Sequence, residues 1–218
     1  MLRYDRQTRT LACCLAAVAG FVDALAFLEL GGFFVSFMSG NSTRLGVGLA
    51  TDIAHAATAA GLIATFVLGV VLGTLVGRAA LPRRAPRIIG LVAFLLAVAA
   101  ALNLIGQTAM AVAAMALAMG CENAAFERDG EVSIGLTYMT GALVKTGQRL
   151  AAALTGGDRW GWAPYLLLWA GLVAGATLGA LAFRVIGLHS LWVAASVAGL
   201  LAVVAHRTIP DEADPSVP

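Results

Sequence analysis

The sequence predicts an all-α membrane protein with six transmembrane helices in a 3+3 inverted repeat, each half carrying one broken, re-entrant segment. Three observations lead to this prediction: an apolar composition, a series of apolar stretches of helical length, and a pattern that occurs twice about 100 positions apart. Of the 218 residues, 60% are hydrophobic and 12% are charged, and the mean hydropathy is +0.89. Soluble domains carry about 25% charged residues, so the composition indicates a single membrane domain over residues 1–218.

Six apolar stretches are each long enough to cross a bilayer, which takes about 20 residues of helix. The first follows a basic start, MLRYDRQTRT, and in this respect it is similar to a signal peptide. It continues through Asp23 to Leu30 without a clear cleavage site, and we therefore expect it to be retained as the first span. The predicted spans cover about 10–30, 55–78, 87–104, 108–127, 162–184 and 188–206.

Basic residues set the expected orientation, because Lys and Arg concentrate on the cytoplasmic side of a membrane. Arginines precede the first span and lie between the second and third spans: Arg3, Arg6, Arg9, Arg78, Arg83, Arg84 and Arg87. We therefore expect both termini to be cytoplasmic. Segment 33–52 would then enter from the outside and return, and segment 132–155 would enter from the cytoplasm. In a second topology, which stays open, both segments cross fully and the repeat is parallel with eight crossings.

The two broken segments are versions of one pattern. SFMSG in the first is matched in chemical type, position by position, by TYMTG in the second. With the same shift of about 100 positions, Asp23 falls on Asn123 and Arg44 falls on Lys145. We also expect Gly69 to match Gly171 and Gly73 to match Gly175.

The two halves of this internal repeat cover residues 10–104 and 108–206. Each half contains three spans, which is an odd number, so the second half enters the membrane with the opposite orientation. Inverted repeats of this kind are typical of transporters, whose substrate and ion sites lie near the midplane where the repeats meet.

In each broken segment, a stretch of extended-strand composition leads to a Ser-Gly or Thr-Gly pair and then to a short helix. Non-helical backbone at membrane depth persists only where protein or water satisfies its polar groups. The start of a helix also leaves several N–H groups unpaired and carries a partial positive charge, which binds anions or polar solute groups. Two such starts, entering from opposite sides, would place their breaks face to face near the midplane.

Three blocks of the sequence carry a resemblance to a known family: GFVDALAFLELGGFFVSFMSGNSTRLG, GCENAAFERDG and LTYMTGALVKTGQRLA. Over nearly the whole chain they resemble the YoaK-like DUF1275 family of bacterial integral membrane proteins. The resemblance implies a multi-pass protein with six spans in the bacterial inner (cytoplasmic) membrane, and it implies no particular substrate. Glu122 is a departure, since the family is expected to carry Gln before Asn123.

Eight polar residues are candidate ligands for a substrate or an ion: Asp23, Ser39, Asn41, Arg44, Glu122, Asn123, Thr140 and Lys145. Ionisable residues inside a span are costly and therefore indicate function, so Asp23 and Glu122 are candidates to carry a proton or a cation. Arg44 and Lys145 would attract an anionic solute group. The alternatives are structural: Asp23 fixes helix packing, Glu122 lies in a water-filled vestibule, the basic side chains balance these charges, and the hydroxyl and amide residues are turn and cap residues.

These features favour a small-solute transporter whose midplane site is exposed to the two sides in turn. A passive solute pore and a non-transporting membrane scaffold or regulatory partner are the alternatives. An enzyme is not expected, because the sequence contains no HExxH motif, paired histidines or Ser/His/Asp set, and its three cysteines lack metal-binding or redox spacing. We expect no cofactor, no metal and no nucleic-acid partner. The expected partners are the lipid bilayer and an unknown small solute, and glycines at small-xxx-small spacing would permit a homodimer.

Overall fold

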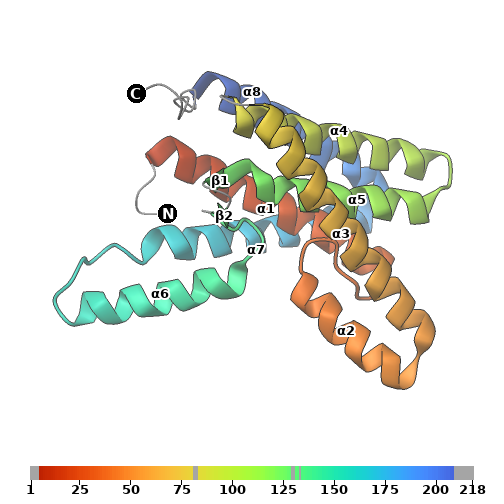
Figure 1. Ribbon diagram of the computed structural model, residues 1–218, viewed down its shortest axis with the longest axis horizontal. Helices are drawn as coiled ribbons and strands as arrows, with labels where there is room; N and C mark the ends of the chain where they lie inside the picture. The colour runs from red at the N-terminus through yellow and green to blue at the C-terminus, as the bar shows by residue number, and fades with distance from the viewer. Residues whose placement is uncertain (1–4, 81–82, 129–130, 133, 209–218) are drawn as a thin grey trace.

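The computed structural model describes residues 5–80, 83–128, 131–132 and 134–208. Within these ranges the chain forms eight α-helices, labelled in chain order in Figure 1. They are α1 (Arg6–Glu29), α2 (Met38–Thr51), α3 (Ile53–Ala79), α4 (Arg84–Leu104), α5 (Thr108–Glu122), α6 (Met139–Leu154), α7 (Ala163–Ile186) and α8 (Leu191–Thr208). The 3-10 turns η1 (Asn123–Phe126) and η2 (Gly187–Ser190) follow α5 and α7, and β1 (Glu127–Arg128) pairs with β2 (Glu131–Val132) as a short antiparallel hairpin.

Helices that are long and apolar enough to cross a membrane make up most of the fold. They form five continuous stretches, the last of which, Ala163–Thr208, has 46 residues. This last stretch contains both α7 and α8, which η2 separates. Each of the six predicted apolar stretches therefore corresponds to a long helix, and the prediction of an all-α membrane protein is confirmed. The number of crossings, the inverted relation of the halves and the orientation of the termini stay predictions.

Two pairs of long helices pack through glycines, α1 with α7 and α3 with α5, and α1 and α7 form the most extensive pair. A Cβ atom at Gly20 of α1 would collide with the carbonyl oxygen of Leu172 in α7. In the other direction, a Cβ atom at Gly175 of α7 would collide with the carbonyl oxygen of Ala17. Small residues allow this backbone-to-backbone approach, because lipid supplies no hydrophobic force to press helices together. Gly20 and Gly175 therefore each face the backbone of the opposite helix within one chain.

The pair α3 and α5 repeats this geometry. Gly69 of α3 meets the carbonyl oxygen of Leu117, just as Gly175 of α7 meets that of Ala17. A Cβ atom at Gly73 would likewise lie only 2.8 Å from the Cα atom of Cys121, and in the other pair a Cβ atom at Gly179 would collide with the backbone of Phe21. The positions on α1 and α5 differ by 100, whereas those on α3 and α7 differ by 106.

The contacts therefore pair Gly69 with Gly175, and the alignment of Gly69 with Gly171 that the sequence suggested is wrong by one helical turn. The reason is the length of one connection. Only Asp52 separates α2 from α3, but residues 155–162 separate α6 from α7. A constant shift along the sequence misses this insertion.

The helices α2 and α6 occupy the two broken segments and project from the bundle of long helices. In Figure 1 both begin near the middle of the molecule, and α2 runs to the lower right while α6 runs to the lower left. Each packs mainly on the long helix that follows it, α2 on α3 and α6 on α7. Their first turns consequently lie close to the centre, and their last turns lie near opposite ends of the molecule.

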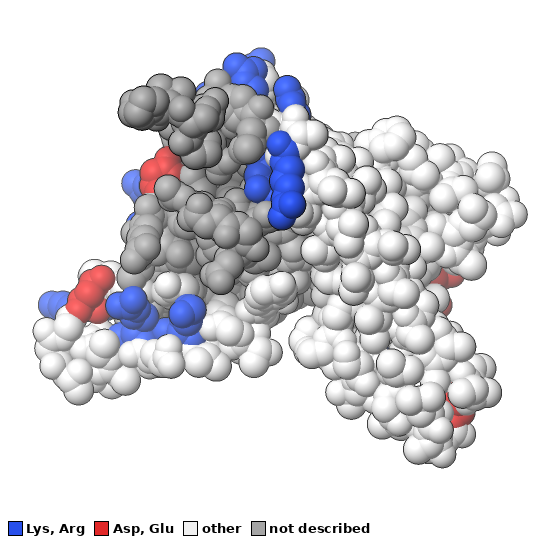
Figure 2. Space-filling view, in the orientation of Figure 1, with Lys and Arg blue, Asp and Glu red and all other residues white. Residues whose placement is uncertain are grey.

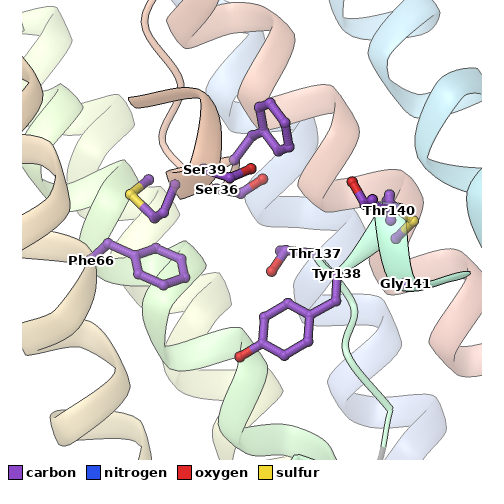
Figure 3. A pocket seen from close by; sticks show the side chains of 10 residues that line it. Ser36, Ser39, Phe66, Thr137, Tyr138, Thr140 and Gly141 are labelled. Atoms are coloured by element: carbon purple, nitrogen blue, oxygen red, sulfur yellow. The ribbon is translucent and has the colours of Figure 1, made fainter. Parts of the chain in front are cut away.

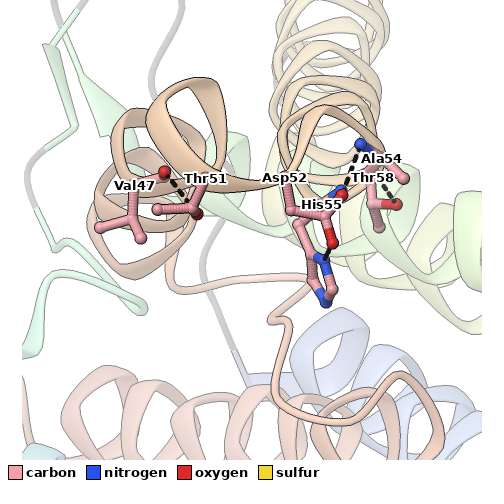
Figure 4. Close-up of polar contacts among 6 residues, drawn as sticks. All are labelled: Val47, Thr51, Asp52, Ala54, His55 and Thr58. Carbon is pink, nitrogen blue, oxygen red and sulfur yellow. Dashed lines mark hydrogen bonds and ion pairs between the residues drawn. The ribbon is translucent and has the colours of Figure 1, made fainter.

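The junction between α2 and α3 is a single capping residue, Asp52, which is shown in Figure 4. The Asp52 carboxylate accepts a hydrogen bond from the backbone N–H of Ala54 at 2.9 Å and pairs with the ring of His55. The hydrogen bond from His55, together with those from the backbone, lowers the pKa of Asp52. This cap fixes a sharp reversal at the end of α2.

Candidate functional site

A cavity of about 260 Å³ lies between the starts of α2 and α6. It is lined by residues 36–39 of the first broken segment, residues 137–141 of the second, and Phe66 of α3. Figure 3 shows the labelled serine, threonine and tyrosine side chains around this space, with Phe66 on one side. The two stretches that match in the sequence, SFMS and TYMTG, thus line one cavity although they are about 100 positions apart.

The first stretch is held in place by Asp23 of α1, which is buried behind the cavity. The backbone N–H groups of Val35 and Ser36 donate to Asp23 Oδ1 at 2.7 and 2.8 Å. The hydroxyl of Ser36 donates to Asp23 Oδ2 at 2.7 Å. Both carboxylate oxygens therefore stabilise backbone and side chain that would otherwise lack partners inside an apolar bundle. Since Ser36 also lines the cavity, its hydroxyl group connects Asp23 to the cavity wall.

Asn41 supplies a second anchor for the same non-helical backbone. Its side-chain amide donates to the carbonyl of Phe34 at 2.6 Å and accepts from the N–H of Phe34 at 3.1 Å. The Asn41 side chain is fully buried. The amide thus makes the hydrogen bonds that a neighbouring strand would make. This structural role accounts fully for a polar side chain at position 41.

Two glycines allow the chain to return from α1 into this segment. Gly31 and Gly32 have φ angles of 65° and 117°, which side chains with a Cβ rarely adopt. The Arg44 guanidinium approaches Gly32 closely and lies over the rings of Phe33 and Phe34, at 5.3 and 5.8 Å from their centroids. Arg44 therefore contacts this segment through cation–π interactions with both rings.

The second stretch has a neutral version of the same anchor. The hydroxyl of Thr137 donates to Asn123 Oδ1 at 3.1 Å, and Asn123 Nδ2 donates to the carbonyl of Met119 at 3.0 Å. Asn123 and Thr137 are both buried, and the predicted repeat aligns them with Asp23 and Ser36. Each half therefore connects the cavity lining to a polar side chain, which lies on α1 in the first half and directly after α5, in η1, in the second.

Glu122 is adjacent to this second anchor and differs from it. Its side chain is fully buried, and neither carboxylate oxygen has a hydrogen-bond partner among the described residues. Asp23 acts on it electrostatically. An ionised carboxylate without a partner is very costly in such surroundings.

The structure thus sorts the eight predicted ligands into three groups. Ser39 and Thr140 line the cavity. The buried residues Asp23, Asn41, Glu122 and Asn123 support it or lie behind it. The third group lies outside the cavity lining: Arg44 and Lys145.

Of the lining residues, sequence reasoning singled out only Ser39 and Thr140; the residues that it missed include Ser36, Thr137 and Phe66. Ser36 and Thr137 could have been found, because they occupy matched positions in SFMSG and TYMTG and are polar in otherwise apolar stretches. Phe66 gives no such signal, since it is one apolar residue in the long apolar run of α3 and only the packing of α3 brings it to the cavity.

Comparison with known proteins agrees with the sequence motifs. The family described as "Protein of unknown function (DUF1275)" matches residues 11–204. A UPF0700 transmembrane protein of Rhizobium meliloti (strain 1021) is 36% identical over 201 residues, which cover 92% of this chain and 86% of that protein. The UPF0700 transmembrane protein YoaK of Bacillus subtilis (strain 168) is 31% identical over 145 residues, or 62% of this chain and 63% of YoaK. No solved structure matches. The chain belongs to the DUF1275 family.

Proposed function

We propose that this member of the DUF1275 family is a secondary transporter that binds a small polar solute in the cavity between the starts of α2 and α6. One observation carries the proposal: two matching segments from opposite halves of the chain line a single cavity, and each contributes hydroxyl groups and the start of a helix. Sites formed by broken helices at the junction of two repeats are typical of secondary transporters.

The lining indicates the chemical class of the solute. Five hydroxyl side chains border the cavity, those of Ser36, Ser39, Thr137, Tyr138 and Thr140, and none of the described lining residues is charged. The partial positive charge at two helix starts favours an oxygen-rich group such as a carboxylate or a carbonyl. A volume of about 260 Å³ is at the small end of ligand cavities. We therefore propose a small metabolite with a hydrogen-bonding oxygen and no large apolar part.

An inverted arrangement of the halves would make this cavity accessible from either side. In our proposal, segment 33–52 re-enters from the outside and segment 132–155 from the cytoplasm, so that six helices cross the bacterial inner membrane and both termini are cytoplasmic. The charge distribution supports this orientation, since Figure 2 shows Lys and Arg on one half of the visible face and none on the other half.

Glu122 is the proposed carrier of a coupling proton or cation, and Asp23 is a positioning residue. The sequence makes Asp23 a candidate for coupling as well, but both of its oxygens already accept hydrogen bonds from the first broken segment. Glu122 has no such engagement among the described residues. Binding of a cation or a proton there would change the electrostatics beside Asp23 and Asn123, which hold the two linings of the cavity.

A thermal-shift screen of the purified protein in detergent tests the solute site. Small carboxylates, neutral polar metabolites and inorganic anions are added in turn, because a ligand at a hundredfold excess over its Kd stabilises the folded state by about 2.7 kcal/mol. Ser39→Leu fills the cavity and should abolish the shift. Ser42→Leu is the matched control, since Ser42 is exposed on the same helix and does not line the cavity.

A solute that raises the Tm of the wild type and of Ser42→Leu, but not of Ser39→Leu, supports the site. The proposal is contradicted if no member of these classes shifts the Tm of folded protein, or if the shift persists in Ser39→Leu. Uptake of the identified solute into proteoliposomes then separates a transporter from a binding protein.

A further inference from the structure

A second cavity, of about 440 Å³, lies where the start of α4 meets the end of α8. Four of its lining residues carry a guanidinium or imidazole group: Arg83, Arg87, His206 and Arg207. Arg83 Nη1 lies 3.1 Å from His206 Nε2, and because a guanidinium can only donate, the imidazole nitrogen accepts this hydrogen bond. The bond joins the ends of the two helices and keeps the basic groups around one space.

The rest of the lining is apolar, and none of the described lining residues is acidic. Pro86 of α4 and Ala202 and Val203 of α8 complete the wall. The cavity therefore combines several positive charges with hydrocarbon surface. A soluble anion uses only the first of these features, whereas a phospholipid uses both, since its phosphate is anionic and its acyl chains are apolar.

The position of the cavity also fits a lipid. It lies at the ends of two long apolar helices, which is where the headgroups of a surrounding bilayer are found. Basic pockets between transmembrane helices at this level bind anionic headgroups.

A neighbouring groove shows that the charge is concentrated on one side of α8. This groove, of about 340 Å³, lies between α1 and α8 and is lined by Leu201, Val204 and Thr208 on the α8 side. Among its described lining residues, Arg6 is the only one with a full positive charge. The two grooves share the end of α8 and differ in basic groups, so the groove toward α4 is the one built for an anion.

We propose that the cavity between α4 and α8 binds an anionic phospholipid, with the phosphate held by the guanidinium groups of Arg87 and Arg207 and the acyl chains against Pro86, Ala202 and Val203. This site is independent of the proposed solute cavity, because the two share no lining residue. The bound lipid would stabilise the α4–α8 pair at its charged end.

The test measures thermal unfolding in detergent with added dioleoyl phosphatidylglycerol or dioleoyl phosphatidylcholine, which share acyl chains and differ in net charge. Native mass spectrometry of the same samples counts the bound lipid. We expect phosphatidylglycerol to raise the Tm more than phosphatidylcholine. In Arg87→Gln/Arg207→Gln the apparent affinity for phosphatidylglycerol should fall about 30-fold, since each basic residue near an anionic surface contributes about 1 kcal/mol.

The matched control is Arg149→Gln/Arg159→Gln, which removes the same charge from exposed positions outside the cavity and should keep the affinity. An equal loss in the control would overturn the proposal, because attraction would then be general. Equal Tm shifts with both lipids would also overturn it, and so would full reproduction of the shift by inorganic phosphate, which would indicate a soluble anion. If Arg87→Gln/Arg207→Gln does not fold, Arg87→Gln and Arg207→Gln are measured singly, and wild-type affinity in both contradicts the site.

Discussion

The two anchors behind the cavity are built on one plan but differ by one charge. In the first half a carboxylate, Asp23, accepts three hydrogen bonds from the segment that it holds. In the second half a neutral amide, Asn123, occupies the matching position and accepts one hydrogen bond from Thr137. The carboxylate of the second half is one residue earlier, at Glu122, and has no partner among the described residues.

This shift by one residue separates two tasks that the same chemical group can perform. A carboxylate with all its hydrogen bonds made is a rigid structural element, and its removal leaves donors unsatisfied. A carboxylate without partners holds no segment in place and is free to bind a proton or a cation. The comparison therefore predicts opposite outcomes for substitutions at Asp23 and Glu122.

Asp23→Ala should have the largest effect on stability. It leaves the N–H groups of Val35 and Ser36 and the Ser36 hydroxyl without an acceptor in a buried place, and each unsatisfied group costs about 1–3 kcal/mol. We expect the free energy of unfolding to fall by more than about 3 kcal/mol. Asn123→Ala, which removes the acceptor of one hydroxyl, should cost about 1–3 kcal/mol.

Unfolding of both variants in detergent, followed by intrinsic fluorescence, measures the difference. Asp23→Asn is the control for the role of charge, since its amide oxygen can still accept hydrogen bonds. An equal loss of unfolding free energy in Asp23→Ala and Asn123→Ala would show that the two anchors contribute equally to stability. It would contradict the difference that we infer between them.

Glu122→Gln should leave folding intact and change ion binding. Since the carboxylate makes no hydrogen bond within the described residues, its neutral isostere is expected to keep the free energy of unfolding within about 1 kcal/mol of wild type or to raise it. Uptake of an identified solute should lose its dependence on an imposed pH or cation gradient. The pair of measurements distinguishes the roles, because a loss of more than about 2 kcal/mol would mean that Glu122 is a structural residue like Asp23.

The glycine contacts give a smaller effect that tests how the halves correspond. Gly69→Ala and Gly175→Ala should destabilise by similar amounts, about 1–3 kcal/mol, because each new methyl group meets a carbonyl oxygen of the facing helix. Gly61→Ala is the control, since Gly61 lies on α3 with open space around it. Thermal unfolding of the three variants measures these losses of stability. Similar losses in Gly61→Ala and Gly69→Ala would contradict the packing, and a loss in only one of Gly69→Ala and Gly175→Ala would contradict the correspondence.

Much of this fold was predictable from the sequence, because a membrane helix is specified by local composition. The length of an apolar run, such as the one in α3, gives the approximate length of the helix. The SFMSG and TYMTG stretches indicate where the helical pattern breaks. The partners of the polar residues were not predictable. Asp23 and Ser36 are 13 positions apart, and only the return of the chain through Gly31 and Gly32 brings them into contact.

Arg44 is a second residue whose contacts could not be predicted from the sequence. The sequence suggests that Arg44 attracts an anionic solute group, whereas its guanidinium lies over Phe33 and Phe34 and outside the cavity lining. The insertion between α6 and α7 likewise shifted the true match of the glycines by one turn. In each case the residue type was informative, but the contact depended on distant segments that a single sequence does not relate.

The smallest expected effect concerns the junctions that follow the two short helices. Asp52 caps α3 with its side chain, whereas α7 begins after Trp162 without a side-chain cap. Asp52→Ala should therefore lower the Tm slightly, and Asp158→Ala, in the longer connection of the second half, should lower it less. Because hydrogen bonds from His55 and the backbone lower the pKa of Asp52, its stabilising effect is present near neutral pH and is lost as the pH falls through that lowered pKa. The Tm difference between wild type and Asp52→Ala should accordingly shrink in acid, and a difference that grows in acid would contradict the cap.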